Sequence, residues 1–169
     1  MHYVNITKTR LKLSIALLLL SFCITTQAQP LPDTGVDGKL GTLVTAEWLN
    51  QHLDDPDLVV LDCRVKVEIT DEGTFKSVSG LPGYKAGHIP SAGFADLITA
   101  LSDATSPFQF TLPSADQFAA AMAALGVGDN TRVVLYDDFN SAWAARVWWM
   151  LRWIGFDRAA LLDGGLGAW

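Results

Sequence analysis

The turn from Asp137 to Asn140 is the stretch of this chain best placed to do chemistry. It follows the apolar run RVVLYD and leads into a helix for which Ser141 is the expected capping residue. Free backbone N–H groups at a helix N-terminus, together with the helix dipole, favour negative charge. Such a turn lowers the pKa of a cysteine placed at its start and makes a thiolate nucleophile. Asp137 stands at that position, where its carboxylate is stabilised as an anion but carries no transferable sulfur atom.

Two interpretations of this turn are open. Asp137 and Asp138 can cap the helix and fill the anion site themselves, or they can form a ligand pocket together with Asn140, Ser141 and Arg146. The simpler interpretation of Arg146 is that it is an ordinary surface residue or a member of an ion pair. An aspartyl-phosphate hydrolase is disfavoured because those enzymes use Asp-x-Asp spacing with a magnesium ion. A cysteine phosphatase is excluded because the turn has no cysteine and no arginine six residues later.

A second group of candidate residues follows an earlier apolar run. Asp62 and Arg64 are expected to form an ion pair that supports the turn. Cys63, between them, is the single cysteine after the first 29 residues, so no internal disulfide is expected. A packed thiol is favoured for Cys63 over a sulfur carrier. His88 has the chemistry of a general base. The histidines are not spaced for a metal, so we predict no metal site and no cofactor.

The elements that position these residues alternate between strands and helices. We therefore predict an α/β fold with a mainly parallel central sheet and helices on both faces. The expected elements are a helix over 45–52 capped by Thr45, a buried strand over 57–63, a β-hairpin over 65–80, a short strand over 93–95, a helix from a capping box at Ser114 and Gln117 to Gly126, a strand over 132–137, a helix over 141–155, and a strand and turn over 159–165.

The helix over 141–155 is unusually rich in tryptophan. Trp149 and Trp153 share one face, and Trp148 lies off it, so this helix is expected to bury more than one side. Packing in the core or against another domain is favoured over a ligand platform.

Length and composition indicate a single-domain protein, and the N-terminal pattern indicates that it is exported. The chain has 169 residues, half of them apolar, and a net charge of -6 without a Lys/Arg cluster, which argues against nucleic acid as a partner. Residues 1–28 have the basic start, apolar run and small-residue end of a signal peptide, with a leader loop over 29–42 and one domain over 43–169. We expect a periplasmic or secreted protein with no stable membrane association after cleavage. An uncleaved anchor and a lipid on Cys23 are the less favoured alternatives.

Four motifs in order resemble the rhodanese family of sulfurtransferases: VVLDCR, GHIPSAGFADL, VVLYDDFNSAWAARVWWMLRWIGF and ALLDGGLGAW. The resemblance covers about residues 43–169 and implies a three-layer rhodanese-like domain. It also implies a structural role for His88, because the histidine of the family's turn is mostly structural. The matching positions are Asp62 and Arg64 of the family's Asp-x-Arg, Gly87, His88, Ile89, Pro90 and Ala92 of its Gly-His-Ile-Pro-x-Ala turn, and Gly164, Gly165 and Trp169 of its closing turn.

The departure from the family pattern is at Asp137, where active rhodanese domains carry the cysteine that becomes a persulfide and hands sulfur to cyanide or another thiophile. Tandem members of the family have an inactive first half, often with aspartate there and a tryptophan-rich helix. The resemblance therefore implies a sulfurtransferase that uses thiosulfate or 3-mercaptopyruvate. This chain would be its non-catalytic half, inactive alone and partnered in cis by a second rhodanese domain, and its ending at Trp169 suits a chain cut before that domain. The alternative is an exported, non-catalytic binding module for an anion or a protein.

Overall fold

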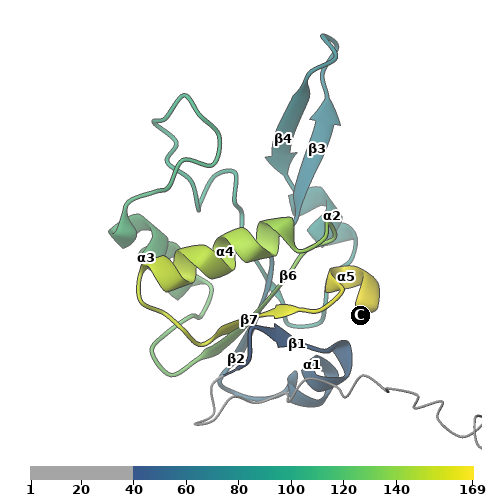
Figure 1. The fold of residues 1–169 in the computed structure, drawn as a ribbon, viewed down its shortest axis with the longest axis vertical. Helices are drawn as coiled ribbons and strands as arrows, with labels where there is room; N and C mark the ends of the chain where they lie inside the picture. Colours follow the sequence, from purple (N-terminus) through teal and green to yellow (C-terminus); the bar gives the residue numbers. More distant parts are fainter. Residues whose placement is uncertain (1–39) are drawn as a thin grey trace, which may run out of the picture. The chain divides into compact units, whose positions relative to one another are not determined.

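The computed structural model describes residues 40–169 of the chain (Figure 1). The predicted signal peptide at residues 1–28 and most of the predicted leader loop at residues 29–42 lie outside the described residues. The end of that leader contacts the domain, because Leu40 is buried and the Thr42 carbonyl accepts a hydrogen bond from the Leu161 N–H at 2.9 Å. Within residues 40–169, the structure contains no helix of the length and apolar character needed to cross a membrane.

A parallel sheet forms the centre of the domain, with its strands in the order β1-β7-β6-β2-β5. Each neighbouring pair of strands runs parallel. Continuous apolar runs form the interior strands, as expected for a sheet covered on both faces. The prediction of a mainly parallel central sheet is confirmed. The strands are β1 (Leu43–Val44), β2 (Leu58–Asp62), β5 (Gly93–Phe94), β6 (Arg132–Tyr136) and β7 (Ala159–Leu162).

Helices cover both faces of this sheet (Figure 1). The helices among the described residues are α1 (Ala46–His52), α2 (Leu81–Ala86), α3 (Ala115–Ala124), α4 (Ala142–Trp153) and α5 (Gly165–Ala168). Successive side chains of a strand point to opposite faces. On β6, Val133 and Leu135 therefore join the apolar core under α3 and α4, whereas Val134 and Tyr136 join the core under α1. The predicted three-layer arrangement is confirmed.

The two predicted helix caps upstream of the turn are present. The Thr45 hydroxyl accepts a hydrogen bond from the Trp48 N–H at 3.1 Å, and the Ser114 hydroxyl accepts one from the Gln117 N–H at 3.2 Å. The second cap is not the reciprocal box that the sequence predicts. The Gln117 amide instead donates to the Ser102 carbonyl at 3.2 Å, because the loop before α3 passes beside it and offers a free acceptor.

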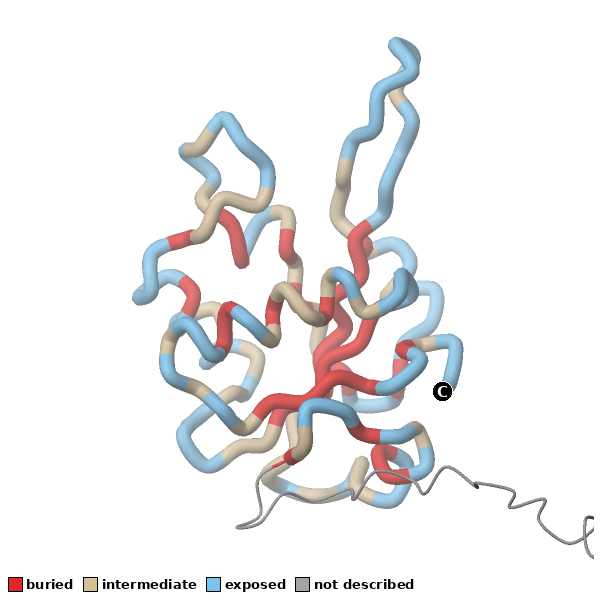
Figure 2. Tube along the Cα trace, viewed as in Figure 1, coloured by how far each residue is buried: buried red, intermediate tan, exposed pale blue. Residues whose placement is uncertain are grey.

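The predicted hairpin is confirmed as a two-stranded antiparallel ribbon, separate from the main sheet. It consists of β3 (Val65–Ile69) and β4 (Phe75–Ser79), and Gly73 supplies the positive φ of 75° that the turn needs. The ribbon projects away from the sheet (Figure 1), and most of its length is exposed (Figure 2).

The tryptophans of α4 do not all pack in the core. Trp148 is half-buried, and its indole N–H donates to the Ala159 carbonyl at 2.9 Å. Trp149 and Trp153 are 48% and 42% exposed, so the prediction that this helix buries more than one side is wrong within the described domain. Smaller side chains form the buried face of α4: Ala144, Val147, Met150 and Leu151.

Candidate functional site

The turn after β6 closes around the side chain of its own first residue. Asp137 is 1% exposed. Its Oδ1 accepts hydrogen bonds from the N–H groups of Phe139 at 2.9 Å and Ser141 at 3.0 Å. Its Oδ2 accepts from the N–H groups of Trp143 at 2.8 Å and Ala144 at 2.9 Å. These four N–H groups, which we call the anion cradle, are thus all directed at one carboxylate.

Ser141 does not cap α4, contrary to the prediction. Its backbone is left-handed, with φ 59°, and its hydroxyl makes no capping hydrogen bond. Asn140 is also left-handed, with φ 51°. Successive residues in such turn conformations direct their N–H groups inward and create an anion-binding concavity. Asp137 reaches across this concavity to the first turn of α4 and acts as the cap, because its carboxylate is longer than a serine hydroxyl and can accept more bonds.

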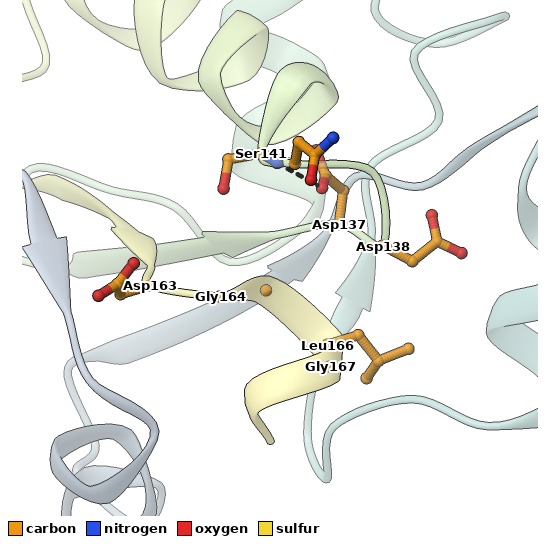
Figure 3. Close-up of a pocket in the computed structure, with 9 residues that line it drawn as sticks. Asp137, Asp138, Ser141, Asp163, Gly164, Leu166 and Gly167 are labelled. Carbon is orange, nitrogen blue, oxygen red and sulfur yellow. Dashed lines mark hydrogen bonds between the residues drawn. The ribbon is translucent and has the colours of Figure 1, made fainter.

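The interpretation that the turn fills its own anion site is therefore confirmed for Asp137 and wrong for Asp138. The Asp138 side chain is exposed and points away from the cradle (Figure 3).

A pocket of about 590 Å³ lies against the turn (Figure 3). Four predicted residues line it: Asp137, Asp138, Asn140 and Ser141. The rest of the lining comes from the segment after β7, which was matched as a sequence motif but not predicted as part of the pocket: Asp163, Gly164, Gly165, Leu166 and Gly167. Three of the lining side chains are carboxylates, so the open pocket is acidic.

The glycine turn after β7 packs directly on the backbone of the cradle. The Leu166 N–H donates to the Asp137 carbonyl at 2.8 Å. Gly165 has a positive φ of 57°, and a Cβ at this position would lie 2.5 Å from the same carbonyl oxygen. A glycine is therefore required here both by backbone conformation and by space.

Arg146 does not line the pocket, and its predicted place there is wrong. Its Nη2 donates to the Phe110 carbonyl, and its guanidinium lies over the Phe110 ring, 5.8 Å from the centroid. Burial lowers the pKa of Arg146. The face of α4 that carries this residue turns toward the loop before α3 and not toward the cradle, so the loop carbonyl takes the guanidinium.

The predicted ion pair of Asp62 and Arg64 is confirmed. Asp62 ends β2 and is fully buried. The Arg64 Nε and Nη2 donate to its carboxylate at 2.7 to 3.0 Å, and Nη2 also donates to the Gly87 carbonyl at 2.7 Å. Burial acts to lower the pKa of Arg64, but the hydrogen bonds and charge of Asp62 outweigh it and raise that pKa above its ordinary value. The pair therefore ties β2 to the turn that carries His88.

The region around His88 is held by aromatic contacts. Its ring stacks on Tyr84, with centroids 4.0 Å apart, and its Nδ1 lies 2.8 Å from the Tyr84 carbonyl oxygen. The next N–H, of Ile89, donates to the buried Tyr136 hydroxyl at 3.1 Å. Burial, with a further contribution from Asp62, raises the pKa of Tyr136. These contacts hold the turn that carries His88 in place, and His88 is not among the residues that line the pocket.

Cys63, the one cysteine among residues 40–169, is fully buried. Burial raises the pKa of its thiol well above the ordinary value, and the charges of Asp62 and Asp137 raise it further. A thiol in this environment stays protonated at neutral pH and is a poor nucleophile. Within the described residues, no group of three or more histidine, cysteine and acidic side chains is arranged to hold a metal ion. The turn thus combines the backbone of an anion site with no sulfur that could react.

Comparison with known proteins identifies the kind of domain that carries this turn. The family model described as "Rhodanese-like domain" matches residues 45–169. The chain is 40% identical over 126 residues to the 3-mercaptopyruvate sulfurtransferase of Escherichia coli strain K12, and 38% identical over 132 residues to the human 3-mercaptopyruvate sulfurtransferase. Each alignment covers 75% of this chain, but only 43% of the bacterial protein and 42% of the human one. The chain therefore spans less than half the length of these relatives.

Solved structures give the same picture. The crystal structure of an Escherichia coli protein of the 3-mercaptopyruvate sulfotransferase group matches with a TM-score of 0.66 and 39% identity, covering 76% of this chain and 47% of that one. The 3-mercaptopyruvate sulfurtransferase from Leishmania major matches with a TM-score of 0.63 and 30% identity, covering 80% of this chain and 35% of that one.

Proposed function

This chain belongs to the rhodanese-like domain family, and from that membership we propose that it is the non-catalytic half of a rhodanese-type sulfurtransferase. The reaction is the transfer of sulfane sulfur from thiosulfate or 3-mercaptopyruvate to a thiophile such as cyanide. The similarity to 3-mercaptopyruvate sulfurtransferases supports the reaction class. The remaining length of those relatives supports a second rhodanese domain on the same polypeptide, which would carry the reactive cysteine.

The observation that carries this proposal is the carboxylate inside the anion cradle. In active domains of this family, the turn begins with a cysteine whose sulfur is the nucleophile and the carrier. Here the Asp137 carboxylate accepts all four N–H groups of the cradle. A carboxylate oxygen cannot take up and release sulfane sulfur. The cradle is therefore complete as a structure but inert in sulfur transfer.

The role left to this domain is to support the catalytic half. Its backbone is fixed by the Asp62–Arg64 pair, by the glycine turn on the Asp137 carbonyl and by the Tyr136 hydroxyl. A domain held this way offers a rigid wall beside the reactive loop of a partner. We place the full protein in the exported compartment, on the basis of the signal-peptide pattern in residues 1–28.

The alternative of an anion-binding module receives less support from the pocket. The donors that would bind an anion are already occupied by Asp137, and Asp138 and Asp163 add negative charge to the lining. An external anion would have to displace a covalently attached carboxylate and approach two others.

The test compares this 169-residue chain with the complete translation product of its gene. Each is incubated with thiosulfate or 3-mercaptopyruvate, analysed by mass spectrometry for the gain of one sulfur atom, and then treated with cyanide. We expect persulfide and thiocyanate from the complete product only, with the added sulfur located outside residues 40–169. Thiocyanate from the 169-residue chain would refute the non-catalytic role, and a Cys63→Ser variant shows whether that thiol is the source. A complete product that forms no thiocyanate with either donor would refute the reaction class.

A further inference from the structure

The hairpin ribbon, residues 65–79, is mainly apolar on one face and mainly charged on the other, although Ser77 lies on the first and Val78 on the second. Residues paired across an antiparallel ladder lie on the same face. Ile69 pairs with Phe75, and Val67, two residues earlier, lies on the same side. These side chains are 69%, 78% and 48% exposed, respectively. An apolar face of this size on a projecting ribbon is typical of an interaction surface.

The opposite face of the ribbon has the chemistry of a surface in water. Glu68 pairs with Lys76 across the ladder, and the Lys66 ammonium lies 2.8 Å from the Glu68 carboxylate. A ribbon surrounded by solvent on both faces would be expected to carry polar side chains on both. A two-stranded ribbon is also only marginally stable by itself in water. The asymmetry between its faces therefore indicates that one of them is covered in the working protein.

The apolar face continues into a groove at the base of the ribbon. This groove, of about 450 Å³, lies between β3 and the start of α4, where Val65 and Val67 face Phe139 and Trp143. Phe139 is 57% exposed. The indole N–H of Trp143 is buried and has no hydrogen-bond acceptor among the described residues. A docked segment with an apolar side chain would fill the groove and cover Phe139.

We infer that the apolar face of the hairpin ribbon and this groove form the docking surface for the second rhodanese-like domain of the same polypeptide. The inference rests on the proposed function, since it takes its occupant from there. The length of the relatives supports this occupant, because this chain covers only 43% of the 3-mercaptopyruvate sulfurtransferase of Escherichia coli and 47% of the solved structure from Escherichia coli. A domain joined by a short linker is present at a high effective concentration, so a surface of modest size is enough to bind it.

The position of the surface gives the docking a function. Asp138 lines both the groove and the pocket beside the anion cradle. A domain seated on the ribbon therefore closes over the Asp137 turn, and the ribbon sets the distance between the two halves. The charged pair of Glu68 and Lys76 does not line the groove and stays in solvent, whereas Lys66 borders the groove.

The test uses hydrogen–deuterium exchange of the amides in residues 65–79. It compares the complete gene product with the 169-residue chain, and it uses two double variants of the complete product. Ile69→Thr with Phe75→Thr removes one cross-strand pair from the apolar face. Glu68→Thr with Lys76→Thr removes the neighbouring pair from the charged face and is the matched control, because threonine is favourable in strands at all four positions.

We expect exchange in the ribbon to be at least about tenfold slower in the complete product than in the 169-residue chain. The slowing should be lost in the apolar-face variant and kept in the charged-face variant. Equal exchange in the two forms, or equal effects of the two variants, would overturn the docking. A dimer of the 169-residue chain that dissociates when Ile69→Thr and Phe75→Thr are made in that chain would overturn the choice of occupant in favour of a second copy.

Thiocyanate production separates this inference from the proposed function. A complete product that transfers sulfur but leaves the ribbon unprotected overturns the docking alone. A complete product that protects the ribbon but transfers no sulfur overturns the proposed function alone.

Discussion

Removing the charge of Asp137 should destabilise the domain far more than removing that of its neighbour. Asp137→Asn keeps the size of the side chain but replaces one acceptor oxygen with an N–H₂ group. Two of the four cradle N–H groups would then face a donor in place of an acceptor. Asp138→Asn is the matched control, because Asp138 is exposed and points away from the cradle.

The magnitude follows from the two donors that lose their acceptor. A buried donor left unsatisfied costs about 1–3 kcal/mol, so for two such donors we expect Asp137→Asn to lower the free energy of unfolding by about 2–6 kcal/mol. Asp138→Asn should change it by no more than about 0.5 kcal/mol. Domains of this size have about 5–15 kcal/mol of stability, so Asp138→Asn should fold, and Asp137→Asn should fold for all but the largest expected loss.

Urea unfolding followed by tryptophan fluorescence measures both variants, and calorimetry provides a second readout. For a domain of this length, a loss of about 3 kcal/mol lowers Tm by roughly 10 °C. Equal stability of the two variants would refute the account of the cradle, since it would mean that the four short contacts to Asp137 contribute nothing beyond what water supplies.

Three further predictions concern Cys63, the ion pair at the start of β6 and the glycine turn after β7. Burial raises the pKa of the Cys63 thiol, so Cys63 should resist iodoacetamide in the native chain and react only after unfolding. Peptide mapping by mass spectrometry measures this labelling, and labelling of the native chain would contradict the burial of Cys63. The pKa of Asp57 is lowered by its hydrogen bond to Arg132, so the stability from this pair is fully present above about pH 4 and is lost as pH falls through the folded-state pKa. Arg132→Met should flatten that part of the curve of unfolding free energy against pH, and an unchanged curve would rule the pair out. Gly165→Ala should cost about 2–4 kcal/mol in urea unfolding, because its Cβ would approach the Asp137 carbonyl oxygen at 2.5 Å, and a neutral result would show that the turn can shift.

Local patterns predicted the parts of the fold that depend on local physics. The buried runs became the interior strands of the sheet, and the hydroxyls of Thr45 and Ser114 cap the helices that follow them. The same rule failed at Ser141, because capping preferences describe the residue next to a helix. They do not include a carboxylate that reaches the helix from the start of a turn.

Contacts between distant segments set the rest of the site and left no local signal. Leu166 binds the Asp137 carbonyl from a segment well separated in sequence, so the glycine turn was recognisable only as a motif. The side chain of Arg146 follows the path of the loop that contains Phe110, which periodicity does not describe. Trp149 and Trp153 share a helical face, as predicted, but spacing alone did not indicate that this face would be open to solvent.

The carboxylate within the cradle also makes the conformation of this turn independent of anions in solution. A helix N-terminus with open donors binds sulfate or phosphate from solution, and the melting temperature of the protein then rises with the concentration of that anion. Here the counter-ion is part of the polypeptide, so it cannot be diluted, exchanged or outcompeted. The loop should hold the same conformation at any concentration of sulfate or phosphate.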